Sequence, residues 1–440
     1  MTFLPDQPDT TPQNASDVKS NVFASDAMQS LHARGFIHQC TGFGGLDALL
    51  ASGTVPVYIG FDATADSLHV GHLLPIMTLR WLQKHGHKPI VLVGGGTTRI
   101  GDPSFRSDAR PILDDEQIAA NIAGIRKVFD RFLTFGEGPA DAVLVNNADW
   151  LDQLGYVDLL RDVGRHFSVN RMLSFDSVRT RLERQESLSF LEFNYMILQA
   201  YDFLELSRRF GCRAQMGGGD QWANILGGVD LVRRVDGDEV FGMTAPLLTT
   251  SSGVKMGKTA AGAVWLNEDR LAPFDYWQFW RNCEDGDVGR FLRLFTDLPL
   301  ADIEQLENLS GADINEAKIV LADEATRLAH GEVALDAVKQ TASGVFASAG
   351  HRDDLDGLPS VDVTAAEIAD GVGILALLVR AGFAASNSAA RRLVAGGGAR
   401  LNDQPIIDPE ILVTGDDFGE ASLIRLSSGR KRHVALRRMK

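Results

Sequence analysis

Two histidines in the first quarter of the chain have the type and spacing for phosphate chemistry. The segment His69-Val70-Gly71-His72 follows a strand-like run, Val57–Phe61, and precedes a helical pattern that begins near Leu73. The start of a helix offers free backbone N–H groups and the positive end of the helix dipole, which together attract phosphate. Glycine lets a ligand approach the backbone, and two imidazoles can donate hydrogen bonds to phosphate oxygens. These four residues alone are a weak signal, and a metal-binding pair or two ordinary surface histidines remain open alternatives.

A second segment with suitable chemistry is Lys255-Met256-Gly257-Lys258-Thr259, which the polar run Thr249–Val254 precedes. Two lysines on a mobile, glycine-containing loop can close over a polyphosphate and neutralise the charge that develops on it. The alternative for this segment alone is a solvated basic loop. Because the chain has no GxxxxGK[ST] segment, the sequence does not favour a hydrolytic ATPase with a Walker loop.

Composition is typical of a cytoplasmic globular protein. At 440 residues we expect two or three domains with a large core, and 45% hydrophobic with 23% charged residues is ordinary for a soluble chain. Cys40, Cys212 and Cys283 are few and widely spaced, which argues against a disulfide framework and a cysteine zinc cluster and fits a reducing cytosol. We expect no membrane span, because no apolar run is long enough, and no secretory signal at the N-terminus.

The first half of the chain alternates short apolar runs with helical patterns, which predicts a Rossmann-like parallel sheet with crossover helices, an α/β fold. The expected strands are Val57–Phe61, Pro89–Val93, Ala142–Val145 and Arg213–Met216, and the expected helices lie around Leu73–Lys84 and Gln117–Phe132. Glycine-rich turns follow two of these strands and place loops at the carboxyl edge of the sheet, where open parallel sheets bind ligands.

The pattern divides the chain into five parts. These are a disordered tail (1–30), a Rossmann-like catalytic domain (31–270), an α-helical domain (271–346), a linker (347–372) and a small α+β domain (373–440). In the helical part, Ile314–His330 reads as an amphipathic helix, and we assign Trp277 and Trp280 to packing. In the last part we expect helices at Ile374–Ala381 and Ser388–Ala395 and strands at Ala399–Leu401 and Ser422–Leu426.

Charge is distributed unevenly along the chain. The whole chain carries −15, but from Gly373 onward eleven Lys and Arg face only six Asp and Glu, and from Arg425 onward seven basic residues face no acidic one. An acidic body with a basic end indicates that the C-terminal part contacts a polyanion. A merely solvated basic end is the alternative that charge alone leaves open.

Several longer segments resemble bacterial tyrosyl-tRNA synthetases, members of the class I aminoacyl-tRNA synthetases, whose paired signatures the two short motifs also resemble. The segments are Tyr58–His72, Gly101–Ser104, Phe193–Phe203 and Gly218–Trp222, and the resemblance runs from about Gly35 to the C-terminus. Val70, Gly257 and Ala63 stand where isoleucine, serine and proline are usual. None of these departures removes a group that does chemistry, and only the stiffness of the lysine loop is affected.

The resemblance implies a site for tyrosine. Tyr58 and Asp202 resemble the pair that holds the substrate hydroxyl, and a buried pair of this kind disfavours phenylalanine, which would leave both groups unsatisfied. Tyr195, Gln199 and Asp102 resemble the set that binds the substrate ammonium, and Gln221 is expected to orient the substrate carboxylate. Tyr195, Gln199 and Asp202 also have the spacing of one helix face; on that spacing alone, packing, solvation and capping would explain them equally well.

The resemblance also implies an ATP site. His69 and His72 are expected to contact the phosphates, with Gly71 allowing close approach, while Asp62 and Thr64 help to seat the triphosphate. Asp220 resembles the carboxylate that binds the ribose. Lys255, Lys258 and Thr259 are expected to close over pyrophosphate as it leaves. Mg²⁺ accompanies ATP, and no protein-bound structural metal is expected.

The basic end resembles the alpha-L RNA-binding module of a ribosomal protein. Its expected RNA-contacting residues are Arg391, Arg392, Arg400, Arg430, Lys431 and Arg432, which supply affinity for phosphates more than sequence reading. The resemblance therefore implies a homodimeric tyrosine–tRNA ligase that uses L-tyrosine, ATP and tRNA(Tyr). A tryptophanyl-tRNA synthetase shares the catalytic fold, but Tyr58, Asp202 and the basic end disfavour it. The two intact motifs disfavour a non-catalytic RNA-binding paralogue.

Overall fold

The computed structural model describes residues 13–14, 23–102, 113–253, 256–259, 262–346, 355, 358–419, 421–429 and 432–439. The chain forms two compact units. The first comprises Met1–Lys258, Trp265–Asn267 and Cys283–Leu321, and the second comprises Thr259–Val264, Glu268–Asn282 and Ala322–Lys440. Among the described residues, no helix combines the length and the apolar character that crossing a bilayer requires.

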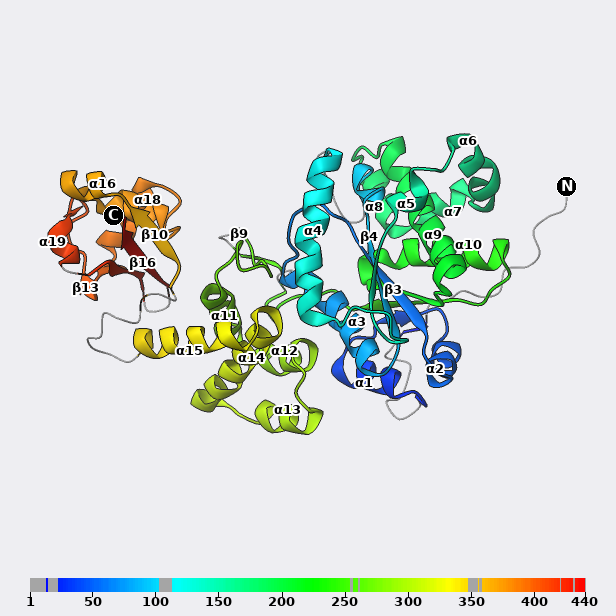
Figure 1. Cartoon of the computed structure of the whole chain (residues 1–440), viewed down its shortest axis with the longest axis horizontal. Coiled ribbons are helices and arrows are strands. Elements are labelled where there is room, and N and C mark those ends of the chain that lie inside the picture. Colours follow the sequence, from blue (N-terminus) through cyan, green and yellow to red (C-terminus); the bar gives the residue numbers. More distant parts are fainter. Residues whose placement is uncertain are drawn as a thin grey trace. The chain divides into compact units, whose positions relative to one another are not determined.

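A seven-stranded sheet forms the centre of the first unit, with the strand order β1-β2-β7-β6-β3-β4-β5. Two of its neighbouring strands, β3 and β4, are labelled in Figure 1. The strands are β1 (Gln13–Asn14), β2 (Gln39–Cys40), β3 (Pro56–Phe61), β4 (Lys88–Val93), β5 (Val143–Asn146), β6 (Ala214–Gly218) and β7 (Phe241–Ala245). Strands β3 to β7 are parallel, whereas β1 and β2 pair antiparallel at one edge. The structure thus confirms the predicted fold class and, with small shifts at their ends, the four predicted strands.

Strand β7 has no counterpart among the predicted strands. Its five residues are all buried, so its sequence lacks the alternation of apolar and polar residues that marks a half-exposed strand. In the sequence, a buried parallel strand of this length looks like any other short apolar run. Only its pairing with β6 in the structure identifies it as a strand.

Helices follow the strands as the crossover pattern requires. Helix α3 (Leu73–Lys84) has the predicted bounds and directly follows the short 3-10 helix η2 (Val70–His72). Helix α9 (Phe190–Phe210) begins with a capping box between Ser189 and Glu192 and ends at Gly211, which has a left-handed backbone. It packs along α10 (Trp222–Val235), and the two helices contribute to a core that also contains Tyr58 of β3.

The other helical segments of the first unit are α1 (Asp26–Arg34), α2 (Phe43–Ala51), η3 (Thr97–Arg99), α4 (Asp115–Phe132), α5 (Ala148–Leu151), α6 (Tyr156–Asp158), η4 (Leu159–Val163), η5 (Gly164–His166), α7 (Val169–Ser174), α8 (Asp176–Glu183), η6 (Gly219–Gln221), η7 (Asp285–Asp287), α12 (Val288–Phe295), α13 (Leu300–Glu307) and η8 (Gly311–Asp313). Helix α4 contains the predicted helix at Gln117–Phe132 and starts earlier because Asp114 caps it, accepting a hydrogen bond from the Gln117 backbone.

The predicted disordered tail, 1–30, extends too far. Helix α1 begins at Asp26, where Ser25 caps it by accepting a hydrogen bond from the Met28 backbone N–H. Asp47 of α2 accepts hydrogen bonds from the backbone N–H and the hydroxyl of Ser25 at 2.9 and 2.8 Å. A carboxylate distant in sequence therefore orders the end of the expected tail, and a local pattern cannot show this.

The helical part of the second unit contains α11 (Pro273–Arg281) and α15 (Glu332–Phe346), which contact each other. Helix α14 (Ile314–His330) has the predicted bounds and passes from the first unit into the second. Trp277 and Trp280 are buried, as expected for packing residues, and the Trp277 indole donates to Asp323 at 2.8 Å. Two short strands, β8 (Lys258–Thr259) and β9 (Gly262–Ala263), form a separate two-stranded sheet.

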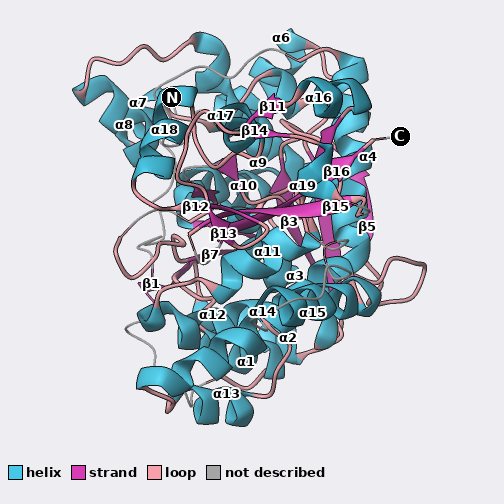
Figure 2. Cartoon of the chain, turned by 90° about the vertical axis from the view of Figure 1, so that its left-hand side faces the viewer, coloured by secondary structure: helices cyan, strands magenta, loops and turns pink. Residues whose placement is uncertain are grey.

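The C-terminal part contains a five-stranded sheet with the order β10-β16-β15-β12-β13, and its strands β12 and β15 are visible in Figure 2. Its strands are β10 (Ser360–Val363), β12 (Ala399–Leu401), β13 (Gln404–Pro405), β15 (Leu423–Ser428) and β16 (Arg432–Arg438), with β11 (Val372–Gly373) and β14 (Leu412–Val413) paired beside them. The helices are α16 (Ala365–Asp370), α17 (Ile374–Arg380), α18 (Asn387–Ala395) and α19 (Gly415–Phe418).

The structure confirms both predicted helices and both predicted strands of this part. It also places β10 and α16, which lie in the stretch 347–372 expected to be a linker, in the same sheet and core: β10 pairs in parallel with β16, and Val363 and Ile368 belong to the apolar cluster. The folded part therefore begins near Ser360. A parallel pairing across more than seventy residues leaves no local signal in the sequence.

Candidate active site

His69 and His72 flank the point where β3 leads into α3. The His69 Nδ1 atom accepts a hydrogen bond from the Gly71 backbone N–H at 3.1 Å, and the His72 Nδ1 atom accepts one from the His69 backbone N–H at 3.2 Å. The two rings lie with their centroids 4.1 Å apart. A neutral imidazole that accepts at Nδ1 carries its hydrogen on Nε2. The two backbone hydrogen bonds therefore place the hydrogen of each neutral ring on Nε2.

The described part of the lysine loop lies against this turn. A Cβ atom added to Gly257 would lie 3.2 Å from the His69 ring, and one added to Gly71 would lie 3.4 Å from the Met256 carbonyl oxygen. Gly257 also has a backbone φ of 120°, which glycine adopts without strain. Glycine at both positions is what lets the two motifs, far apart in sequence, come into contact. Lys255 lies outside the described residues, and Lys258 and Thr259 form strand β8.

Asp202 of α9 is buried among polar partners. Its carboxylate accepts hydrogen bonds from the Asn147 amide at 2.9 Å and from the Trp150 indole N–H at 2.8 Å, and the residue is 2% exposed. Burial raises the pKa of Asp202 to about 7, against the opposite effect of the two hydrogen bonds. Two neutral donors thus hold the carboxylate in place without neutralising its charge.

Tyr58 of β3 lies in the same apolar cluster as Phe203, which follows Asp202 in the sequence. The centroids of the Tyr58 and Phe203 rings lie 5.2 Å apart. The Tyr58 hydroxyl is buried and has no hydrogen-bond partner among the described residues. Burial, and then the nearby charge of Asp202, raise the pKa of Tyr58 well above its ordinary value. A buried hydroxyl without a partner is costly, and a ligand hydroxyl in the pocket would relieve that cost.

Tyr195, Gln199 and Asp202 all lie on α9, as their spacing predicts. The Tyr195 hydroxyl donates to Asp62 at 3.2 Å, and burial followed by the charge of Asp62 raises the pKa of Tyr195 well above its ordinary value. The other oxygen of Asp62 accepts from the Thr97 hydroxyl at 3.0 Å. The structure thus joins a residue predicted for tyrosine to one predicted for ATP. The side-chain oxygen of Gln199 is buried with no partner among the described residues.

A second set of hydrogen-bonded polar side chains connects the segment that follows β4 with the segment that follows β6. The Gln221 amide donates to Asp102 at 2.8 Å, and Asn224 donates to the Gln221 oxygen at 3.1 Å. Asp220 lies beside Gln221 in η6, directly after β6. Both groups therefore lie at the carboxyl edge of the parallel sheet, as the glycine-rich turns predict.

The loop after β4 approaches these groups closely. A Cβ atom on Gly94 would lie 2.4 Å from both Asp62 and Thr97, so only glycine fits there. Thr64, which the resemblance assigns to ATP, is exposed in the segment after β3. The Ala63 backbone beside it is held by the Thr98 hydroxyl at 2.8 Å and the Asn121 amide at 2.7 Å.

Sequence reasoning missed the residues that orient Asp202. Asn147 and Trp150 were not predicted, nor was Thr97, whose hydroxyl accepts from Asn147 at 3.0 Å. A signal was available for Asn147, because it directly follows β5 and ligand-binding residues gather at strand ends. Trp150 gives no such signal, since tryptophan one turn into a helix is usually a packing residue.

The predicted RNA-binding residues occupy several elements of the C-terminal part. Arg391 and Arg392 lie on α18, Arg400 on β12 and Arg432 on β16, and all four are exposed. Arg391 pairs with Glu410 at 2.6 Å. Arg430 and Lys431 lie outside the described residues.

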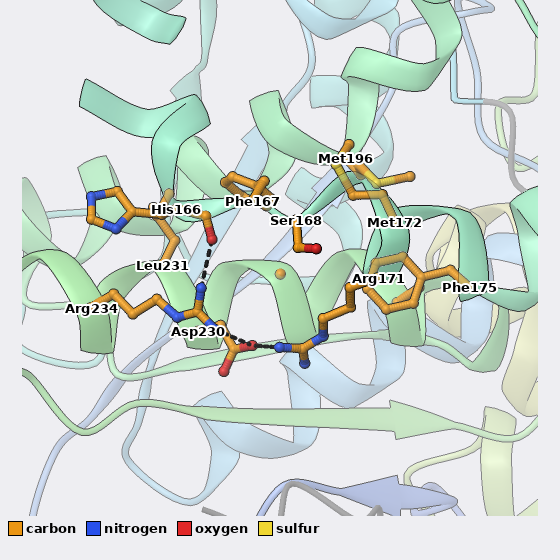
Figure 3. Close-up of a pocket in the computed structure, with 12 residues that line it drawn as sticks. His166, Phe167, Ser168, Arg171, Met172, Phe175, Met196, Asp230, Leu231 and Arg234 are labelled. Atoms are coloured by element: carbon orange, nitrogen blue, oxygen red, sulfur yellow. Dashed lines mark hydrogen bonds and ion pairs between the residues drawn. The ribbon is translucent and has the colours of Figure 1, made fainter. Parts of the chain in front are cut away.

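A separate cavity of about 130 Å³ lies beside α7, α9 and α10 (Figure 3). Phe167, Met172, Phe175, Met196 and Leu231 line it above the ion pair of Arg171 with Asp230. Arg234 donates to the His166 carbonyl at 2.6 Å. None of the predicted site residues lines this cavity, and sequence reasoning did not anticipate it.

Among the described residues, no group of three or more His, Cys, Asp or Glu side chains is arranged to hold a metal ion. The polar groups at the sheet edge instead offer carboxylates, amides and imidazole N–H donors. Such a set suits a charged organic substrate and a polyphosphate.

Comparison with known proteins places this site in a family. A profile described as "tRNA synthetases class I (W and Y)" matches residues 51–347. The chain belongs to this family of class I tRNA synthetases, and it is therefore an enzyme.

Individual relatives narrow the family further. The chain is 62% identical over 413 residues to the tyrosine–tRNA ligase of Rhodospirillum rubrum, covering 94% of this chain and 98% of that protein. It is 58% identical over 414 residues to the tyrosine–tRNA ligase of Dinoroseobacter shibae, with the same coverage of 94% and 98%. A C-terminally truncated mitochondrial tyrosyl-tRNA synthetase from Aspergillus nidulans has a similar crystal structure, with a TM-score of 0.67 and 32% identity over 76% of this chain and 97% of that one.

Proposed function

We propose that this chain is a tyrosine–tRNA ligase. It activates L-tyrosine with ATP to give tyrosyl-adenylate and pyrophosphate, and then transfers tyrosine to the 3′ end of tRNA(Tyr). The observation that carries the proposal is the buried Tyr58 hydroxyl, which has no hydrogen-bond partner in the described part of the chain and belongs to the same site as the oriented carboxylate of Asp202. The names of the bacterial relatives support the same substrate.

The substrate phenol satisfies both groups. Its O–H donates to Asp202, while its oxygen accepts from the Tyr58 hydroxyl. Phenylalanine would leave the Tyr58 hydroxyl unsatisfied and would bury the Asp202 carboxylate against an apolar ring, which costs binding free energy. Tryptophan would present one N–H donor and no acceptor to the same pair. The pocket therefore favours tyrosine over the substrate of the other enzyme in this family.

The other end of the substrate meets the polar groups at the sheet edge. The ammonium is bound by Tyr195, Gln199 and Asp102. The buried side-chain oxygen of Gln199, which has no partner among the residues that the structure describes, provides one acceptor. Gln221, which donates to Asp102 at 2.8 Å, lies where it can orient the substrate carboxylate. The ligand thus bridges two groups that come from different strands.

In the activation step, a carboxylate oxygen of tyrosine attacks the alpha-phosphorus of ATP. One O–P bond forms, the bond from that phosphorus to the pyrophosphate oxygen breaks, and pyrophosphate leaves with the electron pair. His69 and His72 donate from Nε2 to the phosphate oxygens, Gly71 permits close approach, and Asp62 and Thr64 seat the nucleotide. Asp220 binds the ribose. Lys255, Lys258 and Thr259 act on the departing pyrophosphate.

The protein supplies position and charge in this step, and no side chain forms a covalent intermediate. Mg²⁺ enters as the counterion of ATP, and no step depends on a metal held by the protein. We place the enzyme in the cytoplasm, where its three substrates are found.

The C-terminal part binds tRNA. Arg391, Arg392, Arg400 and Arg432 are exposed on its surface, and Arg430 and Lys431 add to the same basic end of the chain. Because β10 belongs to its sheet, a clean deletion begins at Ser360. The shortened protein should form tyrosyl-adenylate at the normal rate and charge tRNA poorly. Normal charging would contradict the assignment.

The enzyme acts as a homodimer. Apolar side chains are exposed along the segment from α6 to the start of α9, among them Phe190 at 68% and Val169 at 58%. Exposed apolar side chains in this number are typical of a contact surface. Sedimentation of the purified protein should show a dimer that Phe190→Asp weakens, and a monomer at micromolar concentration would contradict the proposal.

Amino-acid-dependent pyrophosphate exchange tests the activity directly. Purified protein should exchange labelled pyrophosphate into ATP with tyrosine and give no signal with the other nineteen amino acids. Exchange with tryptophan would identify the other enzyme of the family. A folded protein that supports no exchange but binds tRNA would identify a non-catalytic paralogue.

A further inference from the structure

The polar turn that precedes the lysine loop is attached to the turn before α12. The Glu284 carboxylate accepts hydrogen bonds from two hydroxyls, that of Ser251 at 2.6 Å and that of Ser252 at 2.8 Å. Next to it, Asp287 accepts from the Ser251 backbone N–H at 2.9 Å. These hydrogen bonds lower the pKa of Glu284, so its side chain is an anion at neutral pH. One carboxylate therefore holds two consecutive side chains of the turn.

Ion pairs and hydrogen bonds hold the segment Glu284–Asp287 in place. Asp287 is 1% exposed and pairs with Arg290 at 2.7 Å, and Arg290 donates to the Thr249 carbonyl. The neighbouring Asp285 pairs with Lys318 of α14 at 2.5 Å. The first and last residues of η7 thus bond to the polar turn and to the neighbouring helices. Glu284 is fixed at its base by groups that do not belong to the loop.

The other end of the loop is held at the phosphate-binding turn. The Met256 backbone N–H donates to the Leu248 carbonyl at 3.0 Å, which closes the base of the loop. Gly257 follows directly and lies against the His69 ring. Only a few residues therefore separate the hydroxyls that Glu284 holds from the backbone that contacts His69. Restraint at one end of such a short segment limits the conformations of the other.

We propose that Glu284 is a positioning residue for the activation step: through Ser251 and Ser252 it holds the polar turn and so keeps Met256 and Gly257 against His69. Ordering the loop before ATP arrives lowers the entropic cost of engaging the nucleotide. The role rests on the proposed function, because it assumes that the loop acts on ATP. It is assigned to residues outside both phosphate-binding motifs.

The test is a mutant cycle in tyrosine-dependent pyrophosphate exchange. Glu284→Ala should lower kcat/KM for ATP by about fivefold, the effect of one net hydrogen bond, and leave KM for tyrosine unchanged. Glu284→Gln keeps one acceptor oxygen and should lower kcat/KM for ATP by a smaller factor. The double variant Ser251→Ala with Ser252→Ala should match Glu284→Ala, and the triple variant should lose no more than either. Independent effects would instead multiply in the triple variant and refute the coupling.

Glu316→Ala is the matched control, because Glu316 is exposed on α14 and its side chain makes no hydrogen bond or ion pair with the described residues. It should behave as the wild type. A loss as large as that of Glu284→Ala would mean that the effect reflects net charge rather than the hydrogen bonds to the two serines.

A second measurement does not depend on activity. Limited trypsin digestion of the full chain cleaves within 249–259 only after Lys255 and Lys258, and Glu284→Ala should accelerate this cleavage about fivefold while Glu316→Ala does not. Unchanged cleavage would overturn the positioning role even if exchange activity fell. If the wild type supports no exchange with tyrosine but the cleavage rates differ as expected, the proposed function fails and the attachment of the loop stands.

Discussion

The pocket around Asp202 and the lysine loop serve one proposed reaction, but they are held in different ways. Asp202 and Tyr58 are 2% and 0% exposed, and buried donors from α5 and the end of β5 fix the carboxylate. The loop is held by the exposed hydroxyls of two serines, which donate hydrogen bonds to Glu284. It is also held by close contacts at two glycines, Gly257 beside His69 and Gly71 beside Met256. The difference indicates that the buried site is suited to discriminate between amino acids, whereas the exposed loop is suited to neutralise the charge of a polyphosphate.

A buried pocket discriminates because water cannot replace a missing partner. Every donor or acceptor there must be matched by the ligand, and a mismatch costs the full desolvation of the group. A loop that admits and releases a polyphosphate needs the opposite property. Its hydrogen bonds are exposed and weak in net terms, so the loop can be ordered and released at little cost.

The largest expected effect is in the pocket. Asp202→Ala removes the acceptor for the substrate phenol and the acceptor for one hydrogen bond each from Asn147 and Trp150. We expect kcat/KM for tyrosine to fall on the order of 100-fold, the effect of a hydrogen bond to a buried charge, while KM for ATP is unchanged. Steady-state exchange assays at varied tyrosine and varied ATP measure both values. Equal losses for the two substrates would remove the distinction between pocket and loop.

A smaller effect is expected in the loop. Gly257→Ala places a Cβ atom 3.2 Å from the His69 ring on a backbone with φ of 120°. We expect kcat/KM for ATP to fall about tenfold, since overpacking the loop against the His69 ring costs on the order of 1–3 kcal/mol, with KM for tyrosine unchanged. Gly253→Ala is the control, because Gly253 has φ of 84° but no atom of the described residues lies within 4 Å of its Cβ position. Equal losses in both variants would assign the effect to strain alone.

Tyr58→Phe should separate stability from specificity. The change removes a buried hydroxyl that has no partner among the described residues. The free energy of unfolding should therefore stay constant or rise by up to about 1 kcal/mol. The preference for tyrosine over phenylalanine should fall about fivefold, the effect of one neutral hydrogen bond. Urea unfolding and exchange assays with both amino acids provide the measurements. A clear loss of stability would show that the hydroxyl has a structural partner in solution.

The last expected effect concerns the pH dependence of stability. Burial raises the pKa of Asp202 from an ordinary 3.8 to about 7, so the folded chain binds this proton more tightly than the unfolded chain does. Asp202 therefore contributes stability that is complete below pH 3.8 and is lost as the pH rises through about 7.

Chemical unfolding across this pH range should show the decrease in the wild type and not in Asp202→Asn. Trp150→Phe removes a hydrogen bond that lowers the pKa, so it should move the decrease to higher pH. Identical profiles for the wild type and Asp202→Asn would show that other groups dominate.

The local pattern of the chain was sufficient to predict much of this protein. It predicted the parallel sheet, the bounds of α3 and α14, the histidine turn at a helix start and the helix that carries Tyr195, Gln199 and Asp202. These features depend on periodicity and on turn residues within a few positions of one another. They are encoded locally and can be read without knowing the tertiary structure.

Only the tertiary structure revealed what surrounds those residues. Asn147 and Trp150 orient Asp202 across more than fifty positions, β10 joins a sheet from within an expected linker, and Glu284 holds serines more than thirty positions away. The physical reason is that a hydrogen bond between distant segments has no period and no fixed spacing in the sequence. Which donor reaches which acceptor is decided when the core packs, and with it the orientation of the carboxylate on which the proposed specificity for tyrosine rests.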